Sequence, residues 1–290
     1  MDEVAAAQPA GGIMRSRRML IVASALIGIA VFAAFLVADF PYKDTLTSLL
    51  APYNLKLTYE SQRLSPPIGA ELVGVQLFST TGNGDEALLQ SPAVTLAPTI
   101  ASLLFGQPGM HVRANLYGGV VHVTIHQRAG AVNLDFSLDS LKLAQSTPLR
   151  SFGAIVKGNL SGNGAAQING PLLPDDHATM AVNGDQIEVA VVDGFPPIRV
   201  GTLTGNVQLD QAAIKLSGIV AHGDDLDLKA DGTIQLGETL DDSTINLTFY
   251  LTPTQNGLDH FGFFLKMLPH PPGPDAPFTV DGNLLSPSIS

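Results

Sequence analysis

Apolar and polar residues alternate with a period of two along most of the chain beyond residue 110. In the stretch "AVNLDFSLDSLKL" the apolar positions are Val132, Leu134, Phe136 and Leu138. The same alternation returns in residues 226–231 and 244–251. A period of two is typical of strands with one dry face and one wet face. The sequence therefore predicts a mainly β protein, an antiparallel curved sheet of degenerate repeats with a few short helices.

The composition agrees with many strands and turns. The 290 residues include 29 Gly and 20 Pro, but only 14% are charged and none is Trp. The hydrophobic fraction of 45% is large enough to form a core. The absence of Cys excludes disulfides and thiolate chemistry. These numbers favour a β-rich globular chain over a helical or disordered one.

The charge balance excludes one class of partner. The formal net charge is −11, and no run of five or more basic residues occurs. Nucleic-acid binding needs clustered Lys and Arg to neutralise phosphates. We therefore expect no nucleic-acid partner.

Residues 19–37, "MLIVASALIGIAVFAAFLV", contain no charged side chain. As a helix this segment would extend roughly 28 Å, which is close to the hydrocarbon thickness of a bilayer. The sequence therefore predicts a transmembrane anchor that contacts inner-membrane lipid. The large anchor side chains include Met19, Leu20, Leu26, Ile29, Phe32, Phe35 and Val37.

A cleaved secretory signal is the alternative interpretation of this segment. Its apolar region would be shorter, about 7–15 residues, and it would end in small residues. Cleavage after Ala38 would place Leu36 at the −3 position, which fits poorly, so an uncleaved anchor is favoured.

Basic residues precede the predicted anchor, and they orient it. Arg15, Arg17 and Arg18 lie just before the segment, and Asp39 lies just after it. The positive-inside tendency then places the N-terminus in the cytoplasm. We expect a cytoplasmic tail (1–18), a transmembrane anchor (19–38) and a periplasmic β-rich domain (39–290) of a single-pass inner-membrane protein.

The dry face of the predicted sheet has two interpretations that the periodicity leaves open. It forms either a closed core or the inside of an open β-groove that holds acyl chains of lipids. In the second case the lipid-facing candidates are Leu226, Leu228, Ile245, Leu247, Phe249 and Leu251.

Two local patterns predict a hairpin and a helix. A hairpin is expected where the alternation is interrupted at Gly118-Gly119. Further along, "NGLDHFGFFLKMLP" is expected to be helical, and Pro269 is expected to end the helix. The apolar residues at helical spacing are Leu258, Phe261, Leu265 and Leu268.

Glycine-rich phrases suggest turns rather than a phosphate cradle. Gly162-Asn163-Gly164 lacks the third glycine of a dinucleotide fingerprint and is interpreted as a hairpin turn. A Gly-polar-apolar phrase is interpreted as a turn followed by strand entry. It occurs at Gly158-Asn159-Leu160, Gly201-Thr202-Leu203, Gly232-Thr233-Ile234 and Gly282-Asn283-Leu284.

The polar clusters do not form a catalytic constellation. His222, Asp224 and Asp225 form a weak candidate for a cation site, but a solvated hairpin tip is the favoured interpretation. We expect no catalytic residues, no cofactor and no metal, and hence a protein that is not an enzyme. The last strand, which contains Pro287, is expected to be an edge strand because proline offers no amide hydrogen to a neighbour.

Several of these features occur together in a known family. The predicted anchor is followed by "FPY", and the chain ends in "VDGNLLSP", in which Gly282, Asn283, Leu284 and Pro287 match a closing phrase. The internal "VKGNLSGNG" and "VGTLTGNVQL" resemble family strands that begin a sheet repeat. The chain thus resembles the GspN family of type II secretion systems, and it is similar to the broader AsmA-like and TamB-like group.

The resemblance implies a non-enzymatic, inner-membrane-anchored periplasmic component of the type II protein secretion system, with other secretion-system subunits as partners. The alternative that it implies is an AsmA-like lipid-binding or lipid-transfer module in the cell envelope. A periplasmic hydrolase is a third alternative, but no nucleophile triad supports it.

Overall fold

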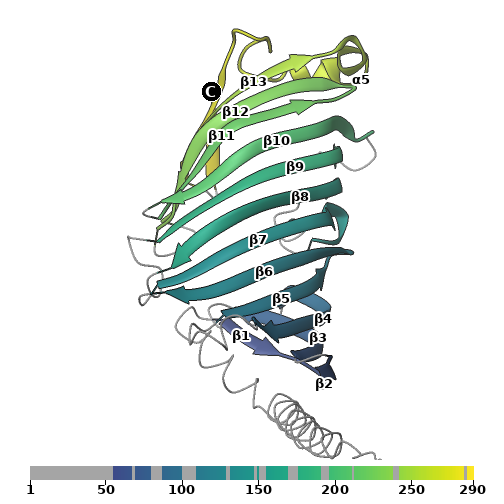
Figure 1. Ribbon diagram of the computed structural model, residues 1–290. Helices are drawn as coiled ribbons and strands as arrows, with labels where there is room; N and C mark the ends of the chain where they lie inside the picture. The colour runs from purple at the N-terminus through teal and green to yellow at the C-terminus, as the bar shows by residue number, and fades with distance from the viewer. Residues whose placement is uncertain are drawn as a thin grey trace, which may run out of the picture.

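The computed structural model shows one large curved sheet (Figure 1). It describes residues 55–66, 69–79, 87–99, 109–128, 131–146, 149, 155–168, 176–190, 196–210, 212–237, 242–283 and 286–290. The predicted tail and anchor lie outside these residues. Within the described ranges, no helix has the length and apolar character needed to cross a bilayer.

Fifteen strands form this single sheet, and every pairing between them is antiparallel. The strands are β1 (Leu55–Thr58), β2 (Ser61–Ser65), β3 (Gly69–Ser79), β4 (Ala87–Pro98), β5 (Gly109–Leu116), β6 (Gly119–Arg128), β7 (Ala131–Lys142), β8 (Ile155–Ile168), β9 (His177–Ala190), β10 (Ile198–Asp210), β11 (Ala213–His222), β12 (Leu226–Gln235), β13 (Thr244–Pro253), β14 (Phe278–Asn283) and β15 (Ser286–Ile289). A 3₁₀ turn, η2 (Leu143–Gln145), follows β7, and the helix α5 (Gln255–Leu265) follows β13. The prediction of a mainly β, antiparallel, curved sheet is confirmed.

From β3 to β15 each strand pairs with its neighbours in the sequence, and the sheet remains open. At one end β1 and β2 both pair with β3, along successive parts of the same strand. At the other end β15 pairs with β14, and Pro287 lies opposite Gly282. The prediction of a terminal edge strand is therefore confirmed.

Most of the large buried side chains lie near the two ends of the sheet, and Leu141 of β7 and Ile187 of β9 are buried between them. At the N-terminal end, Leu72, Val75 and Leu96 form a buried cluster against partly buried side chains of β1, β4 and β5. At the C-terminal end, Phe278 is completely buried and Phe261 of α5 is nearly so. Figure 1 places these two regions at opposite ends of the ladder of strands.

The hairpin prediction is confirmed with a shift of one residue. The turn consists of Tyr117 and Gly118, both with positive φ, whereas Gly119 already belongs to β6 and pairs with Leu116. Two positive φ angles in a two-residue loop match the twist of the flanking strands. The tight turn therefore falls on the first glycine and the tyrosine before it.

The turn interpretation of Gly162-Asn163-Gly164 is wrong. These residues lie in the middle of β8, where Gly162 pairs with Leu138 and with Val182. A Cβ atom at Gly164 would meet the Thr179 carbonyl oxygen and the Phe136 ring. Glycine is required here because neighbouring strands and side chains occupy the space above it.

Three of the four Gly-polar-apolar phrases lie inside β8, β10 and β12, so their interpretation as turns before strand entry is wrong. In the fourth, Gly282 and Asn283 are the last residues of β14, and Leu284 lies outside the described residues. Gly158 and Gly201 have positive φ, and the register of β8 and β10 shifts beside them. They are β-bulge positions, at which an extra residue bends a strand without ending it. Gly232 and Gly282 lie within β12 and β14.

Candidate functional site

One face of the sheet carries an unbroken row of uncharged apolar residues from β4 to β15. We call it the central apolar row. It contains Leu96, Val112, Val123, Phe136, Gly164, Met180, Val207, Leu216, Gly232, Leu247, Val280 and Ile289, each paired with the next. At the usual strand spacing of about 4.8 Å, the row extends roughly 50 Å.

A second row of the same kind lies beside it, and we call it the flanking apolar row. It contains Pro98, Met110, Ile125, Leu134, Ala166, Ala178, Leu209, Ile214, Ile234, Ile245, Gly282 and Pro287. Neither row contains a charged or hydrogen-bonding side chain. From β4 onward, the strands are therefore paired so that their apolar residues lie on one continuous dry face, as the period of two predicts.

The opposite face of the sheet is polar along the same strands. Next to the flanking row, one cross-strand series consists of His111, Thr124, Asp135, Ala165, Thr179, Gln208, Lys215, Thr233, Asn246, Asp281 and Ser288. His111 contacts Thr124 across this face at 3.0 Å. The sheet thus separates a wet side from a dry side over almost its whole width.

The two apolar rows are only partly shielded from solvent. Of all their residues, Leu96 alone is buried, and the others are half-buried or exposed. Core residues covered by a second layer are ordinarily buried on all sides. Among the described elements, α5 covers this face at the C-terminal end. Leu141 of β7 and Ile187 of β9 are also buried, outside the two rows. Along the rows themselves, the described residues between the ends are only half-buried.

The six lipid-facing candidates lie on this dry face, in the adjacent strands β12 and β13. The pairs Leu228 with Leu251 and Ile234 with Ile245 show the shared register. Leu247 belongs to the central row and Ile245 to the flanking row, whereas Leu226, Leu228, Phe249 and Leu251 lie beyond the rows, toward one end of the strands. The alternation in the sequence thus predicted that all six residues share one face of the sheet, and their register agrees.

Helix α5 covers part of the dry face at that end. Phe261 and Leu265 of α5 face Ile198, Leu226 and Leu251 across a small apolar cavity of about 30 Å³. Nearby, Phe278 stacks on Phe249 with a centroid distance of 5.4 Å and on His270 with one of 4.1 Å. Leu226, Leu251 and Phe249 therefore support the capped end, and Leu247 and Ile245 belong to the open rows.

The helix itself agrees in part with the sequence. Phe261 is buried as expected, but Leu258 is exposed and Leu268 lies beyond the last helical residue. Thr254 begins the helix, since its hydroxyl accepts a hydrogen bond from the Gly257 amide at 3.1 Å. A Cβ atom at position 257 would collide with the Asp225 carbonyl oxygen, so glycine lets the helix approach the β11–β12 turn closely.

Asp225 fastens this helix to the sheet. Its side chain is 1% exposed, so the interpretation of this turn as a solvated tip is wrong for Asp225. One carboxylate oxygen accepts the Arg199 backbone amide at 2.7 Å, and the other accepts the Asn256 side-chain amide. The His260 Nδ1 atom lies 3.6 Å away. Residues of β10, the β11–β12 turn and α5 thus meet at one carboxylate.

The surroundings of Asp225 also fix its charge state. Burial alone raises the pKa of a carboxyl group. Hydrogen bonds from Arg199, together with the positive charges of Arg199 and His260, outweigh the burial and hold the Asp225 pKa below its ordinary value. Asp225 is therefore ionised, as an anchor for charged and polar donors requires.

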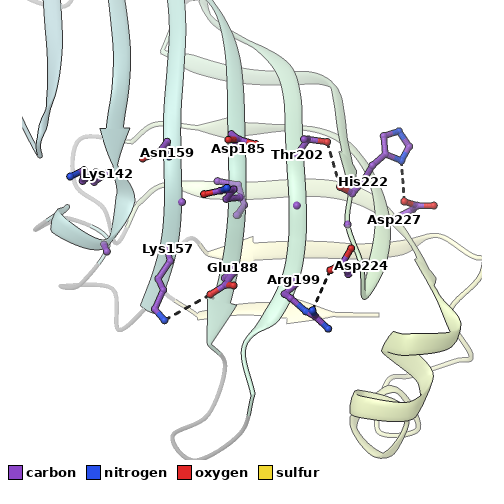
Figure 2. Close-up of a pocket in the computed structure, with 16 residues that line it drawn as sticks. Lys142, Lys157, Asn159, Asp185, Glu188, Arg199, Thr202, His222, Asp224 and Asp227 are labelled. Atoms are coloured by element: carbon purple, nitrogen blue, oxygen red, sulfur yellow. Dashed lines mark hydrogen bonds and ion pairs between the residues drawn. The ribbon is translucent and has the colours of Figure 1, made fainter.

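A polar cleft of about 860 Å³ lies over the bulged parts of β7 to β12 (Figure 2). Lys157 pairs with Glu188 at 3.8 Å and Arg199 pairs with Asp224 at 3.2 Å along it, and the His222 Nδ1 atom lies 3.0 Å from Asp227. Because both signs alternate and pair, the cleft has no single-sign field to attract an ion. In the part of the chain that the structure describes, no group of three His, Asp or Glu residues is arranged to hold a metal.

No pattern in the sequence predicts Arg199, Asn256 and His260 as partners of Asp225. Arg199 precedes Asp225 by 26 positions, and Asn256 follows it by 31.

Comparisons with protein-family models, curated proteins and solved structures find no match to this chain. The features of the molecule that bear on its function are therefore the dry face of the sheet and the end of that face that α5 covers.

Proposed function

We propose that the two apolar rows form a lipid-binding surface, and that the protein is a lipid-binding or lipid-transfer module of the cell envelope. The observation that carries this proposal is an uncharged, half-buried apolar face about 50 Å wide, backed by a polar face. Soluble monomers rarely leave contiguous apolar surface of this extent without a partner. An acyl chain has the matching chemistry, since it is long, apolar and uncharged.

The energetics suit such a ligand. Burying a methylene group is worth about 0.8 kcal/mol, so a chain with about twelve buried methylenes gains roughly 10 kcal/mol before its ordering cost. No hydrogen bonds are needed along the rows, which matches the absence of polar side chains there. The polar headgroup would remain at the edge of the dry face, in water.

The cellular setting of this proposal rests on the sequence. If residues 19–38 anchor the chain in the inner membrane, the sheet lies in the periplasm and starts close to a source of lipid. A non-enzymatic role in type II secretion is the second candidate, and it rests on the motif resemblance. Secretin, secretion-ATPase and pseudopilin genes beside this gene would favour the secretion role, and their absence would count against it.

A pair of adjacent substitutions on β10 tests the lipid-binding proposal. Val207→Asp places a charge in the central apolar row, whereas Gln208→Asp places the same charge on the polar face. We expect lipid to co-purify with the full-length wild type and with Gln208→Asp, and to fall at least about tenfold with Val207→Asp, because a carboxylate in an apolar contact is costly. Mass spectrometry of solvent extracts measures the bound lipid.

Far-UV circular dichroism controls for folding in both variants. If Val207→Asp unfolds the chain, Val207→Thr replaces it as a milder change that keeps the β-branched shape. Wild-type protein without bound lipid, or equal lipid in the folded row variant and the polar-face variant, would contradict the proposal.

A further inference from the structure

The C-terminal part of α5 and the turn after it carry the two most exposed large apolar side chains of the described residues. Phe263 of α5 is 74% exposed, and Met267, two residues beyond the last helical residue, is 72% exposed. At 100° per residue Phe263 points away from the side of α5 occupied by Phe261 and Leu265. Lys266 lies between Phe263 and Met267 in the sequence and is also exposed. This end of the helix therefore presents apolar groups to solvent, with a cation beside them.

Phe263 belongs to a helix that is held against the sheet, and Met267 follows that helix closely. The Thr254 cap and the Asp225 anchor hold the first turn, and Phe261 packs its inner side against the sheet. Solvent exposure of Phe and Met side chains costs free energy that a polar side chain would avoid. That cost is offset if another apolar phase covers them.

The outer side of α5 lies beside the covered end of the dry face. A surface hollow of about 770 Å³ runs along Leu258, Phe263 and Lys266 and is also lined by Pro253 and Leu265. Pro253 and Leu265 line the small cavity between the helix and the sheet as well. The outer hollow and the leucines of β12 and β13 are therefore separated by only these side chains.

We propose that α5 is a bilayer-docking element, and that Phe263 and Met267 insert among the acyl chains of a membrane at this end of the sheet. The inference rests on the proposed lipid-binding function, for which it supplies an entry and exit point. In Figure 1, α5 lies at the far end of the ladder from β1, the strand that follows the predicted anchor in the sequence. The apolar rows would then extend from the anchored end toward a docked end.

The size of the patch favours a bilayer over a folded partner. Phe and Met side chains together offer roughly 300–400 Å² of apolar surface. A stable protein interface needs about 800 Å² from each partner. Two apolar side chains with a neighbouring lysine suffice for shallow insertion at a membrane interface, where the ammonium group reaches the headgroups.

The absence of native Cys allows a direct test by site-specific labelling. The full chain in lipid nanodiscs carries an environment-sensitive fluorophore at Met267→Cys or, as the control, at Gln208→Cys on the polar face. Nitroxide quenchers on acyl chains are placed either in the disc or in added vesicles of phosphatidylethanolamine and phosphatidylglycerol. We expect quenching of about twofold or more at 267 in at least one arrangement, and little at 208.

Two double variants are then compared, and the measurement is recruitment of the protein to the vesicles. Phe263→Ser combined with Met267→Ser should abolish recruitment. Leu64→Ser combined with Ile155→Ser should leave it unchanged, because these exposed apolar residues lie on β2 and β8, away from α5. Absence of quenching at 267 in both arrangements would overturn the inference. So would an emission change that depends on protein concentration without vesicles, which would indicate a second copy of the chain.

The outcome is separable from the proposed function. Lipid that stays bound to the chain purified before nanodisc assembly reports occupancy of the apolar rows, and the fluorophore reports docking of α5. Bound lipid without quenching would remove only the docking inference. Quenching without bound lipid would remove the lipid-binding proposal and leave a membrane-docking helix.

Discussion

The capped ends of the sheet and its open middle use the same alternation for different purposes. At the ends, Leu72 and Phe278 are fully covered by neighbouring side chains. In the middle, Val123 and Met180 occupy equivalent dry-face positions but remain half-exposed. The difference lies in what covers the face, because the strands in both regions are long, antiparallel and regularly paired. We infer that the ends stabilise the fold, and that the middle supplies an apolar surface for a ligand.

The comparison predicts its largest effect for Phe278→Ala. This substitution removes a completely buried ring that stacks between Phe249 and His270. We expect the free energy of unfolding to fall by roughly 3–5 kcal/mol, the usual result of truncating a buried aromatic side chain. Urea unfolding followed by far-UV circular dichroism measures the change, since the chain has no Trp.

Val207→Ala is the matched control in the open middle. It removes two methyl groups from a half-exposed side chain, so the expected loss is about 1 kcal/mol or less. A loss at Val207 as large as that at Phe278 would show that the middle is a covered core, and it would break the proposed division between the two regions.

At the Asp225 anchor we expect an effect smaller than that of Phe278→Ala. Asp225→Ala leaves the Asn256 side-chain amide and the Arg199 backbone amide without their acceptor, while the Arg199 guanidinium keeps its ion pair with Asp224. Because Arg199 is also partly exposed, we expect a loss of about 2 kcal/mol, below the range for a fully buried ion pair. An unchanged free energy of unfolding would show that α5 is held by apolar contacts alone.

The Asp225 anchor also predicts a pH dependence. Its pKa is lower in the folded chain than in the unfolded chain, so its contribution is fully present above the ordinary pKa of 3.8 and is lost as the pH falls through the folded value. Asp225→Asn removes the titrating group. The difference in unfolding free energy between wild type and Asp225→Asn should therefore stay constant above about pH 5 and shrink in acid. A constant difference at every pH would contradict the role of the carboxylate charge.

The sequence predicted the features that depend on local alternation. It placed Leu134 and Phe136 on the dry face, and α5 was expected from helical spacing followed by proline. The open form of the sheet was only one of two alternatives, because a covered face and an uncovered face carry the same residues. Whether another layer covers the dry face depends on the tertiary structure, and the period of two does not predict it.

The features that the sequence missed depend on distant neighbours. Gly162 and Gly164 favour a turn locally, but the Phe136 and Met180 side chains occupy the space above them and keep them in a strand. From the sequence alone, Asp225 looks like a solvated turn residue. In the fold, Arg199 of β10 and Asn256 at the start of α5 donate hydrogen bonds to its side chain. In both cases tertiary contacts outweighed a local preference.

The central claim is that acyl chains contact the dry face in the middle of the sheet. A photoreactive amino acid placed at Met180 would lie in the central apolar row, whereas the same group at the adjacent Thr179 would lie on the polar face. Irradiation of the full-length protein in cells, followed by mass spectrometry of the purified chain, measures lipid adducts at each position. The account predicts adducts at 180 and few at 179. Equal adduct levels at the two positions, or none at 180, would contradict it.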